Sequence, residues 1–307
     1  MSPQAPKEFL RGLGPRWHLD VQGHRDEVFA FYQPFHQAQL ARLGPGAEII
    51  ETSRYGSHAK NEFEFYWPER QDDQSLAHED NPKSVLFFVH GGAFVRGDRN
   101  TTPEVYSNVL REFCRSGFIG VNIGYRLAPD ARYPDAAVDI VQAITKAKEV
   151  LSDRRIWLGQ QFLMGHSAGG THCATALFDP CMAEKAASLR EELDGLILMS
   201  PRLKADRDPR NVNAAGVIAY FGEDDTEFEL RSPLTHMKNS DIPLFIGMAE
   251  FENPLLHDYV EPCRRFATYR QYNDHNHMSI ITQFDSGHNE CWKDLQEFCK
   301  SPPTNPV

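Results

Sequence analysis

Gly165-His166-Ser167-Ala168-Gly169 is the segment of this 307-residue chain whose spacing most directly suggests chemistry. The pattern Gly-x-Ser-x-Gly is typical of a sharp strand-to-helix turn that exposes a serine hydroxyl above a sheet as a nucleophile. Glycines at both ends relieve the crowding of such a turn. A purely structural glycine-rich turn would have the same pattern, so the companions of Ser167 decide the interpretation.

His90-Gly91-Gly92-Ala93-Phe94 is the most informative companion, and it directly follows an apolar run at residues 84–89. Acyl transfer places negative charge on the carbonyl oxygen in the transition state, and each fixed backbone N–H can stabilise it by about 3–4 kcal/mol. A loop of this type supplies one half of an oxyanion hole, and the residue after the nucleophile supplies the other half. The predicted donors are therefore the N–H groups of Gly91, Gly92 and Ala168.

Short apolar segments alternate with longer helical patterns along the chain, which predicts a mainly parallel sheet with helices on both faces. The expected strands are residues 84–89, 118–123, 161–164, 195–199 and 244–248. The expected helices are residues 102–113, 136–151, 171–178, 255–263 and 291–299. One of these strands leads into the serine turn and one helix leads out of it, so the elements give Ser167 the setting that its motif requires.

One α/β domain is expected over residues 1–307, because chains of this size commonly build a single large sheet. Two regions depart from the alternation and are candidate lid or cap segments, residues 1–45 and residues 201–235. The first is expected to contain a helix that is broken near Pro34. Residues 72–81 are polar and are expected to form a surface loop.

The chain resembles α/β-hydrolase fold esterases of the hormone-sensitive-lipase and BD-FAE-like (feruloyl-esterase-like) groups. The resemblance covers roughly residues 82–299 and rests on three motifs in order, His90-Gly91-Gly92-Ala93-Phe94, Tyr125-Arg126-Leu127-Ala128-Pro129 and Gly165-His166-Ser167-Ala168-Gly169-Gly170. One departure is Ala93, where many lipase-type members have a third glycine. The resemblance implies that Tyr125 and Arg126 support the oxyanion loop. We expect His90 to hold the glycines of this loop in place and His166 to have a packing role.

The acid of a catalytic triad follows the serine in this fold, and the histidine follows the acid. Residues 243–248 are typical of a buried strand and lead into Ala249-Glu250-Phe251-Glu252-Asn253-Pro254. Related esterases have an Ala-Glu-x-Asp-Pro segment whose second acidic residue completes the triad, so the resemblance favours Glu252. Glu250 at the strand end and Asp258 on the next helical pattern stay open as alternatives.

Three downstream histidines are candidates for the base, His275, His277 and His288. The first two belong to a segment that resembles the Gly-His-Asn-His-x-Ser of the feruloyl-esterase-like group and the Asn-His-Phe-Ser of related formamidases, which favours His277. That choice requires residues 266–272 to form the last strand and residues 279–284 to be helical. Residues 279–284 are rich in β-branched side chains, and if they form the last strand the base would be His288. The spacing permits both.

Together these residues predict a serine hydrolase that works through an acyl-serine intermediate. The resemblance favours a small or medium carboxylic ester, lactone or N-acyl amide as its substrate. Carboxylesterase chemistry is expected first and amidase chemistry second, with no metal and no organic cofactor. An acyltransferase or cyclase with the same triad is the alternative, and a non-catalytic ligand-binding homologue is a third reading. Aromatic side chains that could shape the acyl pocket are Phe29, Phe31, Tyr32, Phe35 and those of residues 219–222.

The composition limits the kinds of partner and the cellular compartment that we expect. The formal net charge of −11 argues against nucleic acid and anionic membrane surfaces, so a small-molecule acyl substrate is the expected partner. The sequence has neither a signal-like N-terminus nor a run of about 18 apolar residues that could span a membrane. Six cysteines show no paired or zinc-like spacing. These features predict a cytoplasmic protein and leave its oligomeric state open, a homodimer included.

Overall fold

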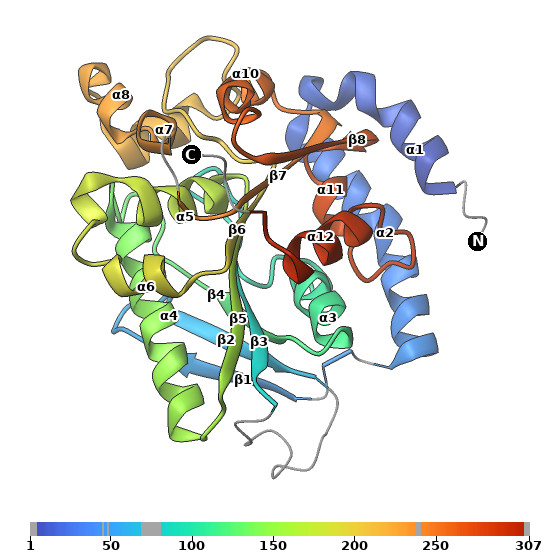
Figure 1. Cartoon of the computed structure of the whole chain (residues 1–307). Coiled ribbons are helices and arrows are strands. Elements are labelled where there is room, and N and C mark those ends of the chain that lie inside the picture. The colour runs from blue at the N-terminus through green and yellow to red at the C-terminus, as the bar shows by residue number, and fades with distance from the viewer. Residues whose placement is uncertain (1–4, 45, 48, 69–80, 238–240, 304–307) are drawn as a thin grey trace.

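The computed structural model of the chain describes residues 5–44, 46–47, 49–68, 81–237 and 241–303 (Figure 1). Within these residues, eight strands form one sheet in the order β1-β2-β4-β3-β5-β6-β7-β8. The strands are β1 Ile49–Arg54, β2 Glu62–Trp67, β3 Lys83–Val89, β4 Ile119–Ile123, β5 Leu158–His166, β6 Gly195–Met199, β7 Leu244–Phe251 and β8 Thr268–Asn276. Only the pairings of β2 with β1 and with β4 are antiparallel, so the predicted mainly parallel sheet is confirmed.

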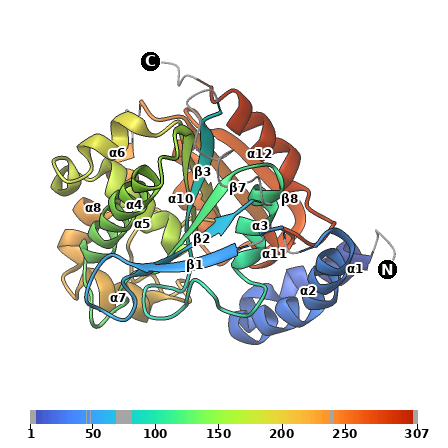
Figure 2. The same ribbon diagram turned by 90° about the horizontal axis from the view of Figure 1, so that it is seen from below.

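Helices cover both faces of this sheet (Figures 1 and 2). The α-helices are α1 Ala5–Leu13, α2 Val21–Leu43, α3 Ser107–Arg115, α4 Asp135–Asp153, α5 Ala168–Phe178, α6 Ala187–Glu192, α7 Ala214–Phe221, α8 Phe228–Arg231, α9 Pro233–His236, α10 Leu256–Val260, α11 Ser279–Thr282 and α12 Cys291–Lys300. Short 3-10 helices are η1 Gly14–Leu19, η2 Pro180–Met182, η3 Asp225–Glu227 and η5 Glu261–Cys263. Helices α3 and α12 lie on one face of the sheet, and α4, α5 and α6 lie on the other.

The central strand β3 shows how the two cores are divided. Successive side chains of a strand point to opposite faces, and a parallel strand between two helix layers is apolar on both. Phe87 and Val89 accordingly pack in the core on the side of α4 and α5, whereas Leu86 and Phe88 pack in the core beside α3 and α12. All four are completely buried, and burying each contributes about 1.5–3 kcal/mol. This double burial fixes the carboxyl end of β3, from which the glycine loop begins.

Helix α2 corrects one expectation. It runs without a break from Val21 to Leu43 although Pro34 lies inside it. A proline removes one backbone hydrogen bond, and the cost is met here by side chains that anchor the helix on both sides of it. Tyr32 and His36 are both buried, and His36 Nε2 donates to the backbone oxygen of Thr282 at 2.7 Å.

The helix expected at residues 102–113 begins only at Ser107. The hydroxyl of Thr102 accepts the backbone N–H groups of Glu104 and Val105, which holds these residues in a turn instead. The remaining expected elements are present, with ends that shift by a few residues. Apart from its last residue, the surface loop expected at 72–81 lies outside the described residues.

Residues 268–282 have the arrangement that His277 requires as the base. Residues 268–276 form the last strand, β8, and α11 makes residues 279–282 helical. The β-branched residues of α11, Ile280, Ile281 and Thr282, are completely buried. Tertiary burial therefore outweighs their strand propensity, and His277 lies on the turn between β8 and α11.

Candidate active site

Ser167 occupies a sharp turn between β5 and α5. Its backbone has φ 54° and ψ −120°, a region that a residue with a side chain adopts only under strain. The turn needs close packing, because a Cβ atom at Gly169 would lie 2.3 Å from the backbone oxygen of Val89. The Ser167 N–H donates to the oxygen of Met199 at 3.0 Å, which ties the turn to β6. The hydroxyl consequently stands above the carboxyl ends of the central strands.

His277 lies between Ser167 and Glu252. Its Nε2 is 2.9 Å from Ser167 Oγ, and its Nδ1 is 2.6 Å from Glu252 Oε2. Because a carboxylate can only accept, Nδ1 carries the proton of the neutral ring, and Nε2 is left to accept from the serine hydroxyl. The backbone N–H of His277 donates to Phe251 O at 3.2 Å, which fixes the histidine to the end of β7.

The carboxylate of Glu252 is buried, with a side chain 1% exposed, and its second oxygen is also occupied. Oε1 accepts from the hydroxyl of Ser200 and from the backbone N–H of Ala249, the latter at 3.2 Å. The competing carboxylate of Glu250 faces elsewhere, because its Oε2 accepts the backbone N–H of Asp274 at 2.7 Å. Asp258, the third candidate, lies on α10. The structure thus brings Glu252, and not Glu250, to the histidine.

The other two histidines lie away from the serine. The ring of His288 packs edge-on against Phe35 at 5.2 Å and borders a separate cavity beside α2. His275 is buried at the end of β8, where its Nδ1 contacts Ser279 Oγ at 3.0 Å, and burial lowers its pKa to about 4. Of the three candidates, His277 is therefore the one in hydrogen-bond contact with Ser167.

A directed chain of hydrogen bonds joins the glycine loop to His277. His166 Nε2 is 2.9 Å from the backbone oxygen of His277, which can only accept, so this nitrogen carries the proton. Burial, and then the neighbouring His277, lower the pKa of His166 well below its usual value and keep it neutral. Its Nδ1 therefore accepts from Tyr106 Oη at 3.1 Å, and Tyr106 Oη in turn accepts the Gly91 N–H at 3.3 Å. His166 does more than the packing expected of it.

The hydrogen bonds from Gly91 through Tyr106 to His166 change which of the predicted oxyanion donors are free to donate to a ligand oxygen. The Gly91 N–H, one of the three predicted donors, already has an acceptor in Tyr106. Across the described residues, the N–H groups of Gly92, Ala93 and Ala168 have none. Gly92 has φ 150°, and a Cβ atom there would lie 1.7 Å from the backbone oxygen of Arg96, so no side chain fits. Ala93 takes a left-handed conformation with φ 51° and borders a cavity that Ser167 and His277 also line.

Aromatic side chains support this loop from behind. Tyr125 donates its hydroxyl to the backbone oxygen of His90 at 2.9 Å, and the two rings stack 4.4 Å apart. His90 Nδ1 bonds the oxygen of Gly91 at 2.8 Å, and burial lowers the pKa of His90 to about 4. Arg126 pairs with Asp139 on α4 at 2.8 Å. Of the residues expected to support the loop, Tyr125 and His90 thus bond its backbone directly, and Arg126 holds Asp139.

Comparison with known proteins agrees with this geometry. Residues 86–267, more than half of the chain, match a family model described as alpha/beta hydrolase fold. The chain belongs to the α/β-hydrolase fold family. A hyperthermophilic esterase of Pyrobaculum calidifontis shares this fold with a TM-score of 0.63 and 19% identity, over 89% of this chain and 93% of that one.

Two relatives found by sequence are esterases by name. A versiconal hemiacetal acetate esterase of Dothistroma septosporum is 27% identical over 181 residues, 59% of this chain and 51% of that protein. Esterase LipI of Mycobacterium tuberculosis is 31% identical over 159 residues, 48% of this chain and 44% of that protein. The matched part therefore spans about half the length of each relative.

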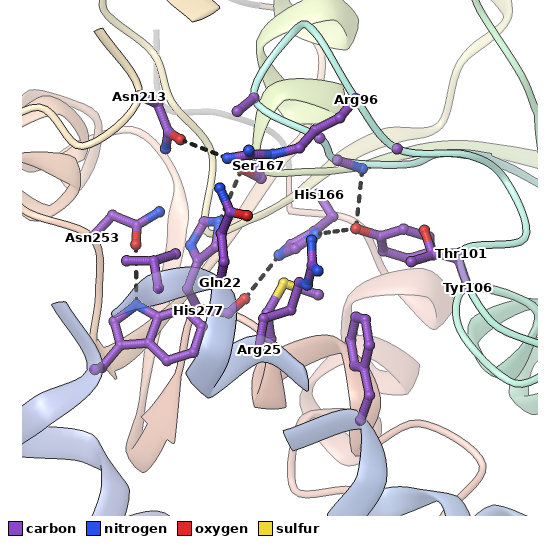
Figure 3. Close-up of a pocket in the computed structure, with 18 residues that line it drawn as sticks. Gln22, Arg25, Arg96, Thr101, Tyr106, His166, Ser167, Asn213, Asn253 and His277 are labelled. Atoms are coloured by element: carbon purple, nitrogen blue, oxygen red, sulfur yellow. Dashed lines mark hydrogen bonds between the residues drawn. The ribbon is translucent and has the colours of Figure 1, made fainter. Parts of the chain in front are cut away.

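A cavity of about 80 Å³ opens in front of Ser167 in this α/β-hydrolase (Figure 3). The N-terminal segment supplies one wall, through Trp17, Arg25 and Phe29, and Asn213 comes from the second candidate lid. Trp17 Nε1 donates to Asn253 Oδ1 at 3.0 Å, and Asn253 directly follows Glu252. No motif marks these wall residues in the sequence, and of the predicted pocket aromatics Phe29 alone is among the described residues that border the cavity.

Two further properties concern metal and membrane. In the part of the α/β-hydrolase that the structure describes, no cluster of three or more His, Cys, Asp or Glu side chains is placed to hold a metal ion. None of the helices described is both long and apolar enough to cross a membrane.

Proposed function

We propose that this α/β-hydrolase is a carboxylic-ester hydrolase in which Ser167 is the nucleophile, His277 the base and Glu252 the residue that orients the base. The observation that carries the proposal is the unbroken hydrogen-bonded path from Ser167 through His277 to Glu252 above a strained turn. Such a path activates a hydroxyl that is otherwise a poor nucleophile. The esterase names of the two sequence relatives support the same class.

The reaction would proceed in two steps. His277 Nε2 takes the proton of Ser167 as Oγ attacks the carbonyl carbon, and Glu252 stabilises the imidazolium that results. The N–H groups of Gly92 and Ala168, with Ala93 as a further donor, would hold the oxyanion. His277 then protonates the leaving alcohol, which departs and leaves an acyl-serine. Water, deprotonated by the same histidine, attacks the acyl carbon, and the histidine returns this proton to Ser167 Oγ as the acid is released.

The substrate class we propose is a small or medium acyl ester. The narrow cavity in front of Ser167 supports this size, and so does the acetate ester in the name of one relative. Residues 1–45 and 201–235 would act as lid segments, since both contribute side chains to the cavity. Lactones and N-acyl amides react through the same intermediate, as does transfer of the acyl group to an alcohol in place of water.

The test is turnover of 4-nitrophenyl acetate, butyrate and octanoate by the purified chain. We expect hydrolysis that is fastest for the short acyl groups and that Ser167→Ala abolishes. Ser188→Ala, at an exposed serine on α6, is the matched control and should keep the wild-type rate. Turnover that persists in Ser167→Ala would overturn the proposal. Transfer of the acyl group to added alcohol in preference to water would indicate an acyltransferase.

A further inference from the structure

The cavity in front of Ser167 has a charge opposite to that of the whole chain. The chain has 43 acidic and 32 basic residues and a formal net charge of −11. Among the described residues that border the cavity, however, are two arginines, Arg25 and Arg96, and neither an aspartate nor a glutamate. A cleft lined by one sign of charge raises the local concentration of ligands of the opposite sign.

Arg96 lies on the glycine loop between β3 and α3, four residues after Gly92. Its Nη2 is 3.5 Å from Asn213 Oδ1, and it has no ion pair with any of the described carboxylates. Partial burial, and then the charge of Arg25, lower the pKa of Arg96. A guanidinium in this position has donors free for a ligand and a neighbouring positive charge that an anion would relieve.

Arg25 approaches the cavity from the opposite element, helix α2. Its guanidinium lies over the ring of Phe29 at 5.9 Å, and both residues border the cavity. Its carboxylate partner at 2.8 Å is the next residue, Asp26, which is 65% exposed and does not border the cavity. Because solvent screens so exposed a pair, Asp26 cancels only part of the charge that Arg25 presents.

The two arginines converge with the reacting groups and with apolar surface. Figure 3 shows both around Ser167 and His277, with Arg96 from the loop and Arg25 from the helix. Trp17 and Phe29 provide aromatic surface in the same cavity. The site therefore combines a nucleophile, an apolar wall and two positive charges, which together match an ester with an apolar part and one anionic group.

We propose that Arg25 and Arg96 form a carboxylate subsite, and that the preferred substrates are esters that carry a carboxylate on the acyl or the alcohol part. The inference rests on the proposed function, because it names the substrate class of the same site. Guanidinium groups bind carboxylates through charge-assisted, often bidentate hydrogen bonds. An ester bound in this way would be positioned as well as attracted, so the preference should be expressed mainly in KM.

The test compares two pairs of substrates that differ in charge and little in shape. One pair places the carboxylate on the alcohol part, 3-acetoxybenzoate against 3-acetoxybenzamide, and the other places it on the acyl part, mono-4-nitrophenyl adipate against 4-nitrophenyl hexanoate. We expect kcat/KM to favour the anionic member of at least one pair by about tenfold. Added salt should reduce this preference, since it screens exposed charges.

Variants assign the preference to the two arginines. The double variant Arg25→Gln with Arg96→Gln should bring the ratio of anionic to neutral kcat/KM close to one, and each single variant should give an intermediate ratio. Arg42→Gln is the matched control, because it removes the same charge from the same helix α2 but beside a different cavity. It should keep the wild-type ratio.

The outcomes separate the two proposals. Hydrolysis of the neutral esters with no anionic preference in either pair, or a preference that persists in the double variant, would overturn the subsite and leave the hydrolase standing. Failure of the chain to turn over any ester, together with failure of a fluorophosphonate to label Ser167, would overturn the hydrolase and the subsite with it.

Discussion

The proposed active site has two halves that are held in different ways. One half consists of residues that follow strands of the sheet, and the N-terminal segment supplies the other half, the wall. Ser167, Glu252 and His277 follow β5, β7 and β8, and hydrogen bonds link them to one another and to the sheet. The N-terminal wall forms a separate cluster around Leu13 and Trp17. We infer a division of labour, by which we mean that the residues after the strands carry out the reaction and the N-terminal wall selects the substrate.

The cluster of the wall nevertheless reaches the catalytic half at two points. Met278, the neighbour of the proposed base, belongs to the N-terminal cluster. On the other side of the site, Trp17 donates to Asn253, the neighbour of the proposed acid. If the division of labour holds, variants of the catalytic half should lower kcat for every ester, and variants of the wall should change KM and the ranking of esters.

The largest effect is expected at the base. His277→Ala should lower kcat by about 10³-fold or more for all esters, because Ser167 loses its proton acceptor. His288→Ala should stay near the wild-type rate, since that ring lies against Phe35 beside a different cavity. Steady-state kinetics on one short ester checks both. The reverse ranking would assign the role of base to His288 and would contradict the assignment of His277 to the catalytic half.

A smaller effect is expected at Tyr106, a positioning residue. Tyr106→Phe removes the hydroxyl between the Gly91 N–H and His166, and a net hydrogen bond is worth about 1 kcal/mol, or roughly a fivefold loss in kcat. KM should stay unchanged, because the hydroxyl acts on the loop and the base. Tyr269→Phe on β8 is the control. A raised KM with an unchanged kcat would instead assign Tyr106 to substrate binding.

The smallest effect is expected in the wall. Trp17→Phe keeps an aromatic ring but removes the donor to Asn253, so KM should rise by roughly two- to fivefold while kcat changes little. Trp157→Phe, at a tryptophan that is 49% exposed and borders a different cavity, is the matched control. A loss in kcat as large as that of the Tyr106 variant would show that the wall also holds the chemistry.

Most residues of the proposed catalytic half could be predicted from the sequence, because the backbone conformation there restricts which residue types fit. The turn at Ser167 and the approach at Gly92 tolerate few residue types, so both appear as motifs. The choice between His277 and His288 could not be made, because it depends on whether residues 279–284 form a strand. Burial of α11 against the sheet, a tertiary effect, makes residues 279–282 helical instead.

The wall could not be predicted because nothing in its sequence is constrained by chemistry. Arg25 is an ordinary residue of a long helix until α2 packs against α11 and brings it to the cavity. The predicted break near Pro34 was wrong, because buried side chains on both sides of the proline compensate for its lost hydrogen bond. The strand β2 was also missed. Its first four residues alternate as Glu-Phe-Glu-Phe, but the alternation is short and ends at Tyr66 and Trp67, and residues 63–67 are all buried.

The most direct test of the central claim is mass spectrometry of the folded chain after reaction with a fluorophosphonate. We predict one adduct, on Ser167, that forms much more slowly in His277→Ala and at the normal rate in His288→Ala. Ser167→Ala should carry no adduct. An unlabelled wild type, or an adduct that remains in Ser167→Ala, would contradict the claim that Ser167 is the nucleophile which His277 activates.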